Sequence, residues 1–309
     1  MSEHQDAVPV ILITGAGGQV GTELRRSLAV LGSVVAVTRR ECDLASVEQI
    51  VATVRKVKPD VIVNAGGYTA VDQAETEVEL AHAVNAEGPR ALAEEARAIG
   101  ALFVHYSTDY VFDGKAARPY TEQDEAKPIS EYGRTKLAGE RAVIETGGDY
   151  YIFRASWIYG LRGANFVKSI ARAAQTRDSL SVVFDQCGAP TAAALVADVT
   201  AHAVRAYLKN EKPMTPGLYH LSASGETNWY EYSRFIVDTL VEAGVSVRAT
   251  RDRIKSIASA DYEQVAQRPS NSRLDTSLLR EALGIELPDW REGVRELLAQ
   301  LVEAKDALH

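Results

Sequence analysis

Residues 10–21 read VILITGAGGQVG, a short apolar run followed at once by a glycine-rich turn. Four consecutive Val, Ile and Leu residues are too few for a helix and favour a strand buried on both faces. Gly15, Gly18 and Gly21 follow at a spacing of three, and a segment with helical periodicity begins at Val20. This order predicts a site for the phosphates of a dinucleotide, because a helix N-terminus supplies free amide donors. The alternative is a turn that needs glycine only for its backbone geometry.

The alternation of short apolar runs with amphipathic segments continues to about residue 155. Strands of this kind, joined by helices, form a parallel sheet that is covered on both sides. We therefore predict a doubly wound, Rossmann-like α/β domain over residues 1–155. The expected strands are 10–13, 34–37, 61–63, 102–105 and 151–153, and the expected helices are 20–31, 46–57, 85–99 and 130–145.

Beyond Trp157 the alternation becomes less regular. We predict a smaller mixed α/β lobe that binds the substrate, formed mainly by residues 156–309, with segments of about 180–210 returning to the main sheet. Proline and glycine mark residues 210–217 and 268–271 as surface loops. The expected helices are 165 onward, 195–208, 230–242 and 290–302, and the expected strands are 180–183 and 218–221.

The composition is that of an ordinary globular protein, with 46% hydrophobic and 25% charged residues. A net charge of -8 argues against nucleic acid as a partner. Two cysteines without paired spacing and six scattered histidines predict neither a disulfide scaffold nor a metal site. No apolar run reaches the roughly 18 residues that a membrane span needs. We expect a cytoplasmic protein with no membrane association.

The end of the second expected strand bears on the choice of dinucleotide. NAD-specific folds usually place an acid there, whereas this sequence reads Thr38-Arg39-Arg40. Paired arginines suit the 2'-phosphate of NADPH, although solvated loop cations are the alternative and NADH stays possible. Asp43 and Leu44, a little further on, are expected to flank the adenine.

A proton-transfer site is predicted where Tyr132 and Lys136 form a YxxxK pattern at the start of an expected helix. Residues four apart share a helical face, so we expect the lysine ammonium to lower the pKa of the phenol. Thr108 follows the fourth expected strand, at the edge where doubly wound folds bind ligands. Its hydroxyl can hydrogen-bond a carbonyl oxygen while the tyrosine protonates it. Together with the glycine turn, these residues predict a short-chain-type oxidoreductase.

Longer stretches of the chain carry further patterns, namely STDYVFDG at 107–114, PISEYGRTKLAGE at 128–140, NAGGYTAVD at 64–72, RASWIYG at 154–160, DQCGAPT at 185–191 and RPSNSRL at 268–274. The first two resemble the extended short-chain dehydrogenase/reductase superfamily. The last three resemble, within it, the dTDP-4-dehydrorhamnose reductase family, and NAGGYTAVD supports them. The resemblance covers about residues 9–300.

The resemblance implies reduction of the C4 ketone of a dTDP-sugar, dTDP-4-dehydro-L-rhamnose, to dTDP-L-rhamnose, the last step in making that sugar donor. Tyr132 would be the proton donor, Lys136 its pKa tuner and ribose anchor, and Thr108 the hydroxyl that orients the carbonyl. The implied sugar contacts are Thr69, Val71, Thr108, Tyr110, Trp157 and Arg268. The implied cofactor contacts are Gly15, Gly18, Gln19, Val20, Arg39, Asp43, Leu44, Ala65, Gly66, Tyr68, Tyr132 and Lys136.

Two roles stay open: Trp157 is alternatively a core residue, and Arg268 is either a pyrophosphate clamp or a loop cation. The chain departs from the family pattern at Gly66-Gly67, where an alanine is usual. Some members dimerise around magnesium held by glutamates, where this chain has Ala194 and Arg291. We therefore expect no metal, and either a monomer or a homodimer.

Two other functions fit the same sequence. One is a related nucleotide-sugar 4-ketoreductase that makes another deoxysugar. The other is a non-catalytic regulatory subunit that binds a dinucleotide, although such a protein would have no need to keep Thr108, Tyr132 and Lys136 together.

Overall fold

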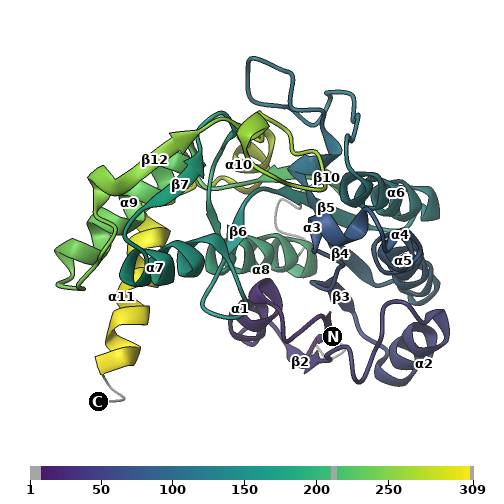
Figure 1. Ribbon diagram of the computed structural model, residues 1–309. Coiled ribbons are helices and arrows are strands. Elements are labelled where there is room, and N and C mark those ends of the chain that lie inside the picture. Colours follow the sequence, from purple (N-terminus) through teal and green to yellow (C-terminus); the bar gives the residue numbers. More distant parts are fainter. Residues whose placement is uncertain (1–7, 210–213, 307–309) are drawn as a thin grey trace.

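A computed structural model describes residues 8–209 and 214–306 of the protein (Figure 1). Within these residues the main sheet has six strands, all parallel, in the order β10-β5-β4-β3-β1-β2. The predicted doubly wound, Rossmann-like sheet is confirmed. Its strands are β1 Val10–Thr14, β2 Ser33–Ala36, β3 Val61–Asn64, β4 Leu102–Thr108, β5 Tyr150–Ala155 and β10 Gly217–Leu221.

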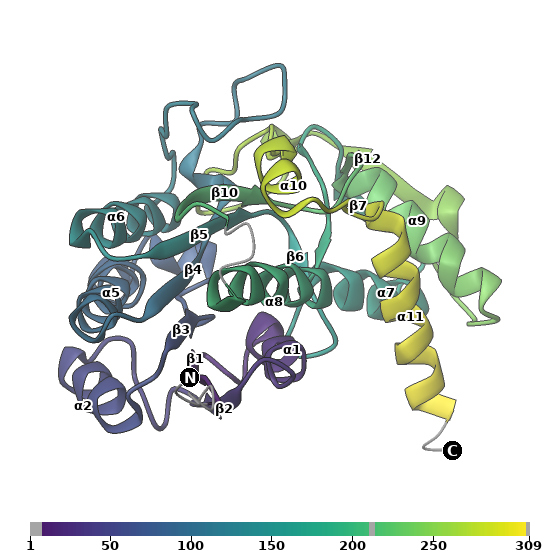
Figure 2. The same ribbon diagram turned by 180° about the vertical axis from the view of Figure 1, so that it is seen from behind.

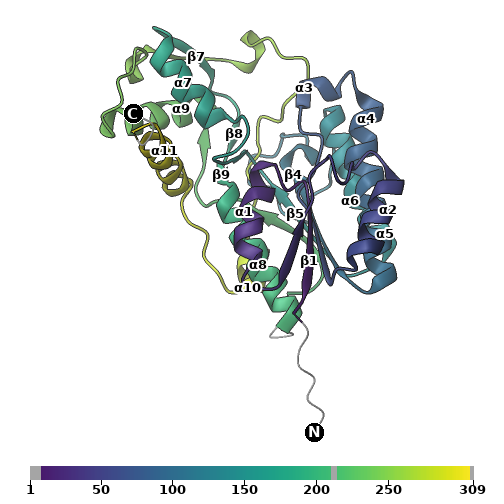
Figure 3. The same cartoon turned by 90° about the horizontal axis from the view of Figure 1, so that it is seen from below.

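Helices cover both faces of this sheet, as the end-on view of Figure 3 shows. α1 (Gln19–Leu28) and α8 (Ala193–Lys209) pack together on one face. α2 (Val47–Val57), α5 (Gly88–Ile99) and α6 (Glu131–Thr146) lie side by side on the other. A separate apolar cluster fills the space between the sheet and each helix layer, which is why the strands are apolar on both faces.

Side-chain caps explain why the helices begin where the sequence predicts. Ser46 accepts a hydrogen bond from the Gln49 amide before α2, and Ser130 accepts one from the Gly133 amide before α6. The helix expected from residue 85 starts earlier, because α4 (Val78–His82) continues through a π-helical turn, Ala83–Glu87, into α5. α1 ends at Leu28, three residues before the expected end.

The lobe forms around its own apolar core, separate from the two clusters beside the sheet, and Tyr232 and Trp290 contribute to it. Figure 2 shows α11 leading away from the sheet toward the C-terminus. The helices of the lobe are α7 Phe166–Thr176, α9 Trp229–Glu242 and α11 Trp290–Asp306, and its strand pairs are β7 Leu180–Val183 with β12 Ile254–Ile257, β8 Cys187–Gly188 with β11 Thr227–Asn228, and β6 Ile158–Tyr159 with β9 Thr191–Ala192.

Part of the chain beyond residue 156 returns to the sheet. α8 packs against α1, β10 pairs with β5, and α10 (Ser277–Leu283) contacts β10. Residues 180–183, which we also expected to return, form β7 in the lobe, because Leu180 and Val182 belong to the lobe core. The domain division at residue 155 stays a prediction. The loop expected at 210–217 lies partly outside the described residues.

In residues 8–209 and 214–306, no helix combines the length and apolar character needed to cross a membrane.

Candidate active site

The carboxyl ends of β1 and β3 meet where the strand order of the sheet reverses, which is the usual ligand crevice of open α/β sheets. Gly15 follows β1 with a φ of 68°, in the left-handed region that favours glycine. A Cβ atom at Gly15 would lie 2.4 Å from the backbone nitrogen of Gly66, which follows β3. The two glycines therefore let two strand ends approach each other directly beneath the turn.

The N-terminus of α1 is open to a ligand. Gly18 is its N-cap, in an extended conformation, and provides no side chain to occupy the first amides of the helix. The Gly18 amide itself donates to the Gly15 carbonyl at 3.0 Å, which closes the turn. Gln19 points toward the lobe, where its Oε1 accepts a hydrogen bond from Asn165 at 2.9 Å. Val20 is buried in the core, so only its backbone is free to serve a cofactor.

At the end of β2, the arginine that we expect to bind a 2'-phosphate is paired with an acidic residue. Arg39 is exposed and forms an ion pair with Asp43, at 3.3 Å between Nε and Oδ2. Glu41, for which we predicted no role, folds its carboxylate back to accept hydrogen bonds from both the amide and the hydroxyl of Thr38. Leu44 is buried in the apolar cluster between the sheet and the layer of α2, α5 and α6. The cofactor roles of Arg39, Asp43 and Leu44 stay predictions.

A buried polar network supports the crevice from below. Asn64, the last residue of β3, accepts hydrogen bonds from the Thr14 hydroxyl at 2.7 Å and from the Gly66 amide at 3.2 Å. Its amide nitrogen donates to Nδ1 of His105 in β4, and burial keeps the pKa of that imidazole well below its usual range. The network holds the backbone around Ala65 and Gly66. Next to it, the Tyr68 amide donates to the Asn85 side chain at 2.8 Å.

The structure brings the three expected catalytic residues to the same edge of the sheet. Thr108 ends β4 and is buried, and its hydroxyl accepts the amide of Tyr110 at 3.2 Å. Tyr132 lies in the first turn of α6, close enough for the Thr108 hydroxyl to act as its hydrogen-bond partner. Lys136 is one turn further along and buried, and its Nζ donates to the Tyr106 carbonyl at 2.5 Å.

The pKa of Tyr132 moves opposite to our expectation. Burial raises it to about 12, the nearby Asp109 carboxyl also raises it, and Thr108 lowers it in part. Lys136 is not among the groups that lower the pKa of Tyr132, and its ammonium group donates to the Tyr106 carbonyl. Burial lowers the pKa of Lys136 itself to about 8. In this arrangement Tyr132 is a protonated phenol at neutral pH.

Asp109 is a buried carboxyl group beside these residues for which the sequence analysis assigned no catalytic role. Its Oδ1 accepts the Thr108 hydroxyl at 3.2 Å, whereas its Oδ2 has no hydrogen-bond partner among the described residues. Burial raises its pKa to about 7, and Ser272 acts in the opposite direction. The position of Asp109 after the strand-end threonine is visible in the sequence, but its burial is not.

Trp157 packs against the lobe core, and we call the group that it forms with Gly188 and Trp229 the wall. It has a φ of 48°, which is uncommon for a residue with a side chain, and its ring stacks on Trp229 with 3.6 Å between centroids. A Cβ at Gly188 would lie 2.7 Å from the Trp157 ring, so the indole lies directly against that glycine. Trp229, which the sequence analysis missed, is held by a hydrogen bond from its Nε1 to Gln186 at 3.1 Å.

Tyr110 and Arg268 lie on the side of the site nearer α3 (Val71–Ala74). The Tyr110 ring meets Tyr132 edge to face at 5.5 Å between centroids. Arg268 forms a two-point ion pair with Asp72, at 2.7 and 3.1 Å. Thr69 is exposed and Val71 is half-buried. The sugar-binding roles predicted for these residues and Trp157 stay predictions.

The segment 268–271, expected to be a surface loop, is only partly exposed. Pro269 and Asn271 are buried, because the segment passes between β8 and the long loop that precedes α6. Sequence patterns of proline and serine indicate a loop but do not show what covers it.

Comparisons with known proteins show the family of the chain. The family described as RmlD substrate binding domain matches residues 9–303. A dTDP-4-dehydrorhamnose reductase of Burkholderia thailandensis is 46% identical over 296 residues, covering 94% of this chain and 99% of the relative. The Escherichia coli K12 reductase is 44% identical over 295 residues, covering 94% and 97%.

Solved structures of dTDP-4-dehydrorhamnose reductases are also similar to this chain. A Bacillus anthracis dTDP-4-dehydrorhamnose reductase in complex with NADP matches with a TM-score of 0.86 and 32% identity, over 95% of this chain and 99% of that one. A Clostridium acetobutylicum relative matches with a TM-score of 0.85 and 34% identity, over 94% and 99%. Because the family match spans nearly the whole length, the chain belongs to the RmlD substrate binding domain family.

Proposed function

We propose that the protein reduces the C4 ketone of dTDP-4-dehydro-L-rhamnose to dTDP-L-rhamnose with NADPH, and that NADH is the alternative cofactor. The observation that carries this proposal is the meeting of Thr108, Tyr132 and Lys136 with the glycine turn at one edge of the sheet. The curated relatives from Burkholderia thailandensis and Escherichia coli are named as reductases of this sugar nucleotide, and they match over nearly their whole length.

The residues present fit a nicotinamide dinucleotide. The close approach of Gly15 to Gly66 and the uncapped N-terminus of α1 leave backbone room and amide donors for a pyrophosphate. Gly15, Gly18 and the backbone of Gln19 and Val20 would hold it, with Lys136 on the nicotinamide ribose. Asp43, Leu44, Ala65, Gly66 and Tyr68 would border the bound cofactor, and the exposed Arg39 would contact a 2'-phosphate, in keeping with the NADP bound to the Bacillus anthracis structure. The bound nicotinamide supplies the hydride that C4 of the sugar receives.

The protein's own part in the reaction is to deliver a proton and to orient the ketone. Tyr132 is protonated at neutral pH because burial raises its pKa to about 12. It donates this proton to the carbonyl oxygen as negative charge develops there, while the Thr108 hydroxyl fixes the direction of that oxygen. The C4 carbon gains a hydride and its oxygen gains a proton, which gives the alcohol. Lys136, with a pKa of about 8, is mostly charged at pH 7 and carries the positive charge of the site.

The sugar nucleotide would lie between this corner and the lobe. The edge of the Trp157 indole, which is stacked on Trp229, and the ring of Tyr110, which meets Tyr132, would border the sugar, with Thr69 and Val71 near α3. Arg268 would contact the pyrophosphate, and its ion pair with Asp72 would hold the guanidinium in position. We propose a cytoplasmic enzyme that works as a monomer or homodimer and binds neither nucleic acid nor membranes, as its net charge of -8 favours.

The direct test gives purified protein NADPH and enzymatically generated dTDP-4-dehydro-L-rhamnose. We expect loss of the nicotinamide absorbance and formation of dTDP-L-rhamnose, identified by NMR, which also fixes the configuration at C4. A product epimeric at C4 would assign the protein to a related 4-ketoreductase. NADPH binding without oxidation by several 4-keto sugar nucleotides would instead support a regulatory subunit.

A first variant addresses the proton donor. Tyr132→Phe keeps the ring but removes the proton, so we expect kcat to fall by about 10²–10⁴ while the Kd for NADPH stays within a few-fold. Tyr207→Phe is the matched control, because Tyr207 bonds Asp149 on the surface away from the site. A Tyr132→Phe enzyme with wild-type kcat would show that another group supplies the proton.

A further inference from the structure

The segment 268–275 joins two parts of the molecule that lie far apart in the sequence, β8 and the long loop 113–129. On one side it pairs with β8, where the Cys187 amide donates to the Ser270 carbonyl at 2.8 Å and the Ser272 amide donates to the Cys187 carbonyl at 2.7 Å. On the other side the Tyr120 amide donates to the Arg273 carbonyl at 2.8 Å. β8 is the strand against which Trp157 lies, and Tyr120 belongs to the long loop 113–129.

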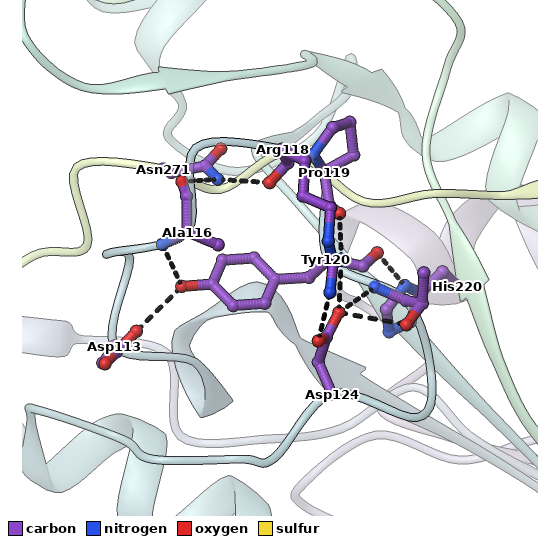
Figure 4. Close-up of polar contacts among 9 residues, drawn as sticks. Asp113, Ala116, Arg118, Pro119, Tyr120, Asp124, His220 and Asn271 are labelled. Carbon is purple, nitrogen blue, oxygen red and sulfur yellow. Dashed lines mark hydrogen bonds and ion pairs between the residues drawn. The ribbon is translucent and has the colours of Figure 1, made fainter.

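Asn271 is the central polar side chain of this junction (Figure 4). It is buried, and its amide nitrogen donates to the carbonyls of both Ala116 and Arg118 at 2.8 Å. Its Oδ1 accepts the backbone amide and the Nε of Arg273, at 3.1 and 2.8 Å. The amide nitrogen of Asn271 thus bonds the loop, and its oxygen bonds the segment. Asn271 ties the first half of the loop to the segment.

The loop 113–129 is stiffened around Tyr120 (Figure 4). The Tyr120 hydroxyl donates to Asp113 at 2.8 Å and accepts the Ala116 amide at 3.1 Å. Its ring stacks on Phe112, with 4.1 Å between centroids and an interplanar angle of 9°. Its carbonyl lies 3.0 Å from Nδ1 of His220, a residue of β10. The loop is therefore held as a fixed element, although it has no helix or strand of its own.

A small apolar cluster connects the loop 113–129 to the elements that carry the reacting residues. Val111, Phe112, Tyr120, Leu137 and Leu274 pack together, so they join the short helix after Thr108, the loop, α6 and the segment. Leu137 is the neighbour of Lys136 in the chain.

The first turn of α6 depends on the same contacts. A Cβ at Gly133 would lie 2.2 Å from the Tyr110 carbonyl oxygen, so the start of α6 packs in direct contact with the turn that follows Thr108. A shift of residues 110–112 therefore displaces Tyr132 relative to Thr108.

We propose that Asn271 is a positioning residue for the reduction: it fastens the loop 113–129 to the lobe and thereby keeps the phenol of Tyr132 aligned with Thr108. It touches neither substrate nor cofactor and acts through the loop and the apolar cluster. The proposal rests on the proposed function, because alignment is assayed through the proton that Tyr132 delivers.

The decisive variant is Asn271→Asp, which keeps the shape of the side chain but places a carboxylate oxygen against two carbonyl oxygens. We expect kcat to fall by about tenfold to a hundredfold, as misplacement of a reacting group by about 1 Å does. The KM for NADPH should stay within about twofold, because no contact of the glycine turn changes. The solvent deuterium isotope effect on kcat should rise, because proton delivery becomes slower than the other steps.

Asn228→Asp is the matched control. Asn228 caps α9 by accepting the Glu231 amide at 2.9 Å, a role that aspartate fills equally well. We expect its kcat and isotope effect to match the wild type. A second variant, Tyr120→Phe, removes the two hydroxyl contacts within the loop but keeps the ring stack, and should show the pattern of Asn271→Asp at a smaller size.

Three results would contradict the proposal. A folded Asn271→Asp enzyme with kcat within about twofold of wild type is one. A fall in kcat at an unchanged isotope effect is another, because loss of folded enzyme alone produces it. If Asn271→Asp does not fold, Tyr120→Phe decides, and unchanged kcat and isotope effect there would overturn the positioning role. A wild-type protein that fails to reduce the sugar would instead refute the proposed function, and the positioning role with it.

Discussion

The glycine turn at Gly15 and the wall at Trp157 both depend on a missing side chain, but they use the space differently. At the turn, glycine lets one strand end approach the backbone of another, so that the contact of Gly15 is with Gly66. At the wall, Gly188 makes room for the indole of Trp157, which Trp229 covers on its other side. The turn is built from the backbone of two short segments, one after β1 and one after β3. The wall is built from side chains of three separate segments.

The largest effect is expected at the turn. Gly15→Ala adds a Cβ 2.4 Å from the Gly66 nitrogen at a φ of 68°, and neither backbone can yield without moving a strand end. Strain of this kind costs about 1–3 kcal/mol, which corresponds to about tenfold to a hundredfold weaker NADPH binding if the turn takes up the shift. Isothermal titration with NADPH measures it.

Gly100→Ala separates strain from crowding. Gly100 has a similar φ of 71°, but a Cβ there has nothing within 4 Å. We expect a stability loss of about 1–2 kcal/mol by thermal denaturation and no change in NADPH affinity. Equal NADPH affinities for the two variants would mean that the close approach to Gly66 does not shape the cofactor site.

The fold was predictable because its signals are local. Apolar runs such as residues 61–63 and caps such as Ser130 specify strands and helix starts within a few residues. The same reasoning failed for β7, because a strand pattern does not say which sheet it joins, and the burial of Leu180 in the lobe decides that.

The convergence of the three expected catalytic residues was predictable from the sequence, but the pKa values of their side chains were not. Thr108, Tyr132 and Lys136 were found from their spacing and do converge. The direction of the Tyr132 pKa depends on burial and on where the Lys136 ammonium points, and neither is written in a spacing of four. Similarly, the stack of Trp229 on Trp157 joins positions without any common pattern, so only the three-dimensional structure reveals it.

A smaller effect is expected at the wall. Gly188→Ala adds a Cβ 2.7 Å from the Trp157 ring, and the stack with Trp229 leaves the indole little freedom to move away. Overpacking of this kind costs about 1–3 kcal/mol, and because a side chain can yield more than a backbone we expect about a tenfold rise in the KM for the sugar nucleotide.

The NADPH affinity of this variant should not change, which sharpens the contrast with Gly15→Ala. Gly217→Ala is the control, because the nearest atoms to a Cβ there lie at 3.7 and 3.8 Å. Steady-state kinetics with each substrate varied in turn measures both constants. A Gly188→Ala enzyme whose NADPH affinity falls as much as its sugar affinity would show that the wall serves the whole site and not the sugar alone.

The smallest effect, none at all, is expected from removal of metal. At the two positions where the family resemblance implied glutamate ligands, Ala194 has no ligand atom, and Arg291 is a cation that pairs with Asp289 and covers the Trp290 ring at 4.6 Å. Within residues 8–209 and 214–306, no three His, Cys, Asp or Glu side chains are grouped so that they could hold a metal ion. We expect kcat and the apparent molecular mass in gel filtration to be the same with and without EDTA. Activity lost in EDTA and restored by magnesium would show that the lobe, unlike the turn, needs a metal whose ligands are not grouped among the described residues. A simultaneous change of mass would show that this metal holds two copies of the chain together.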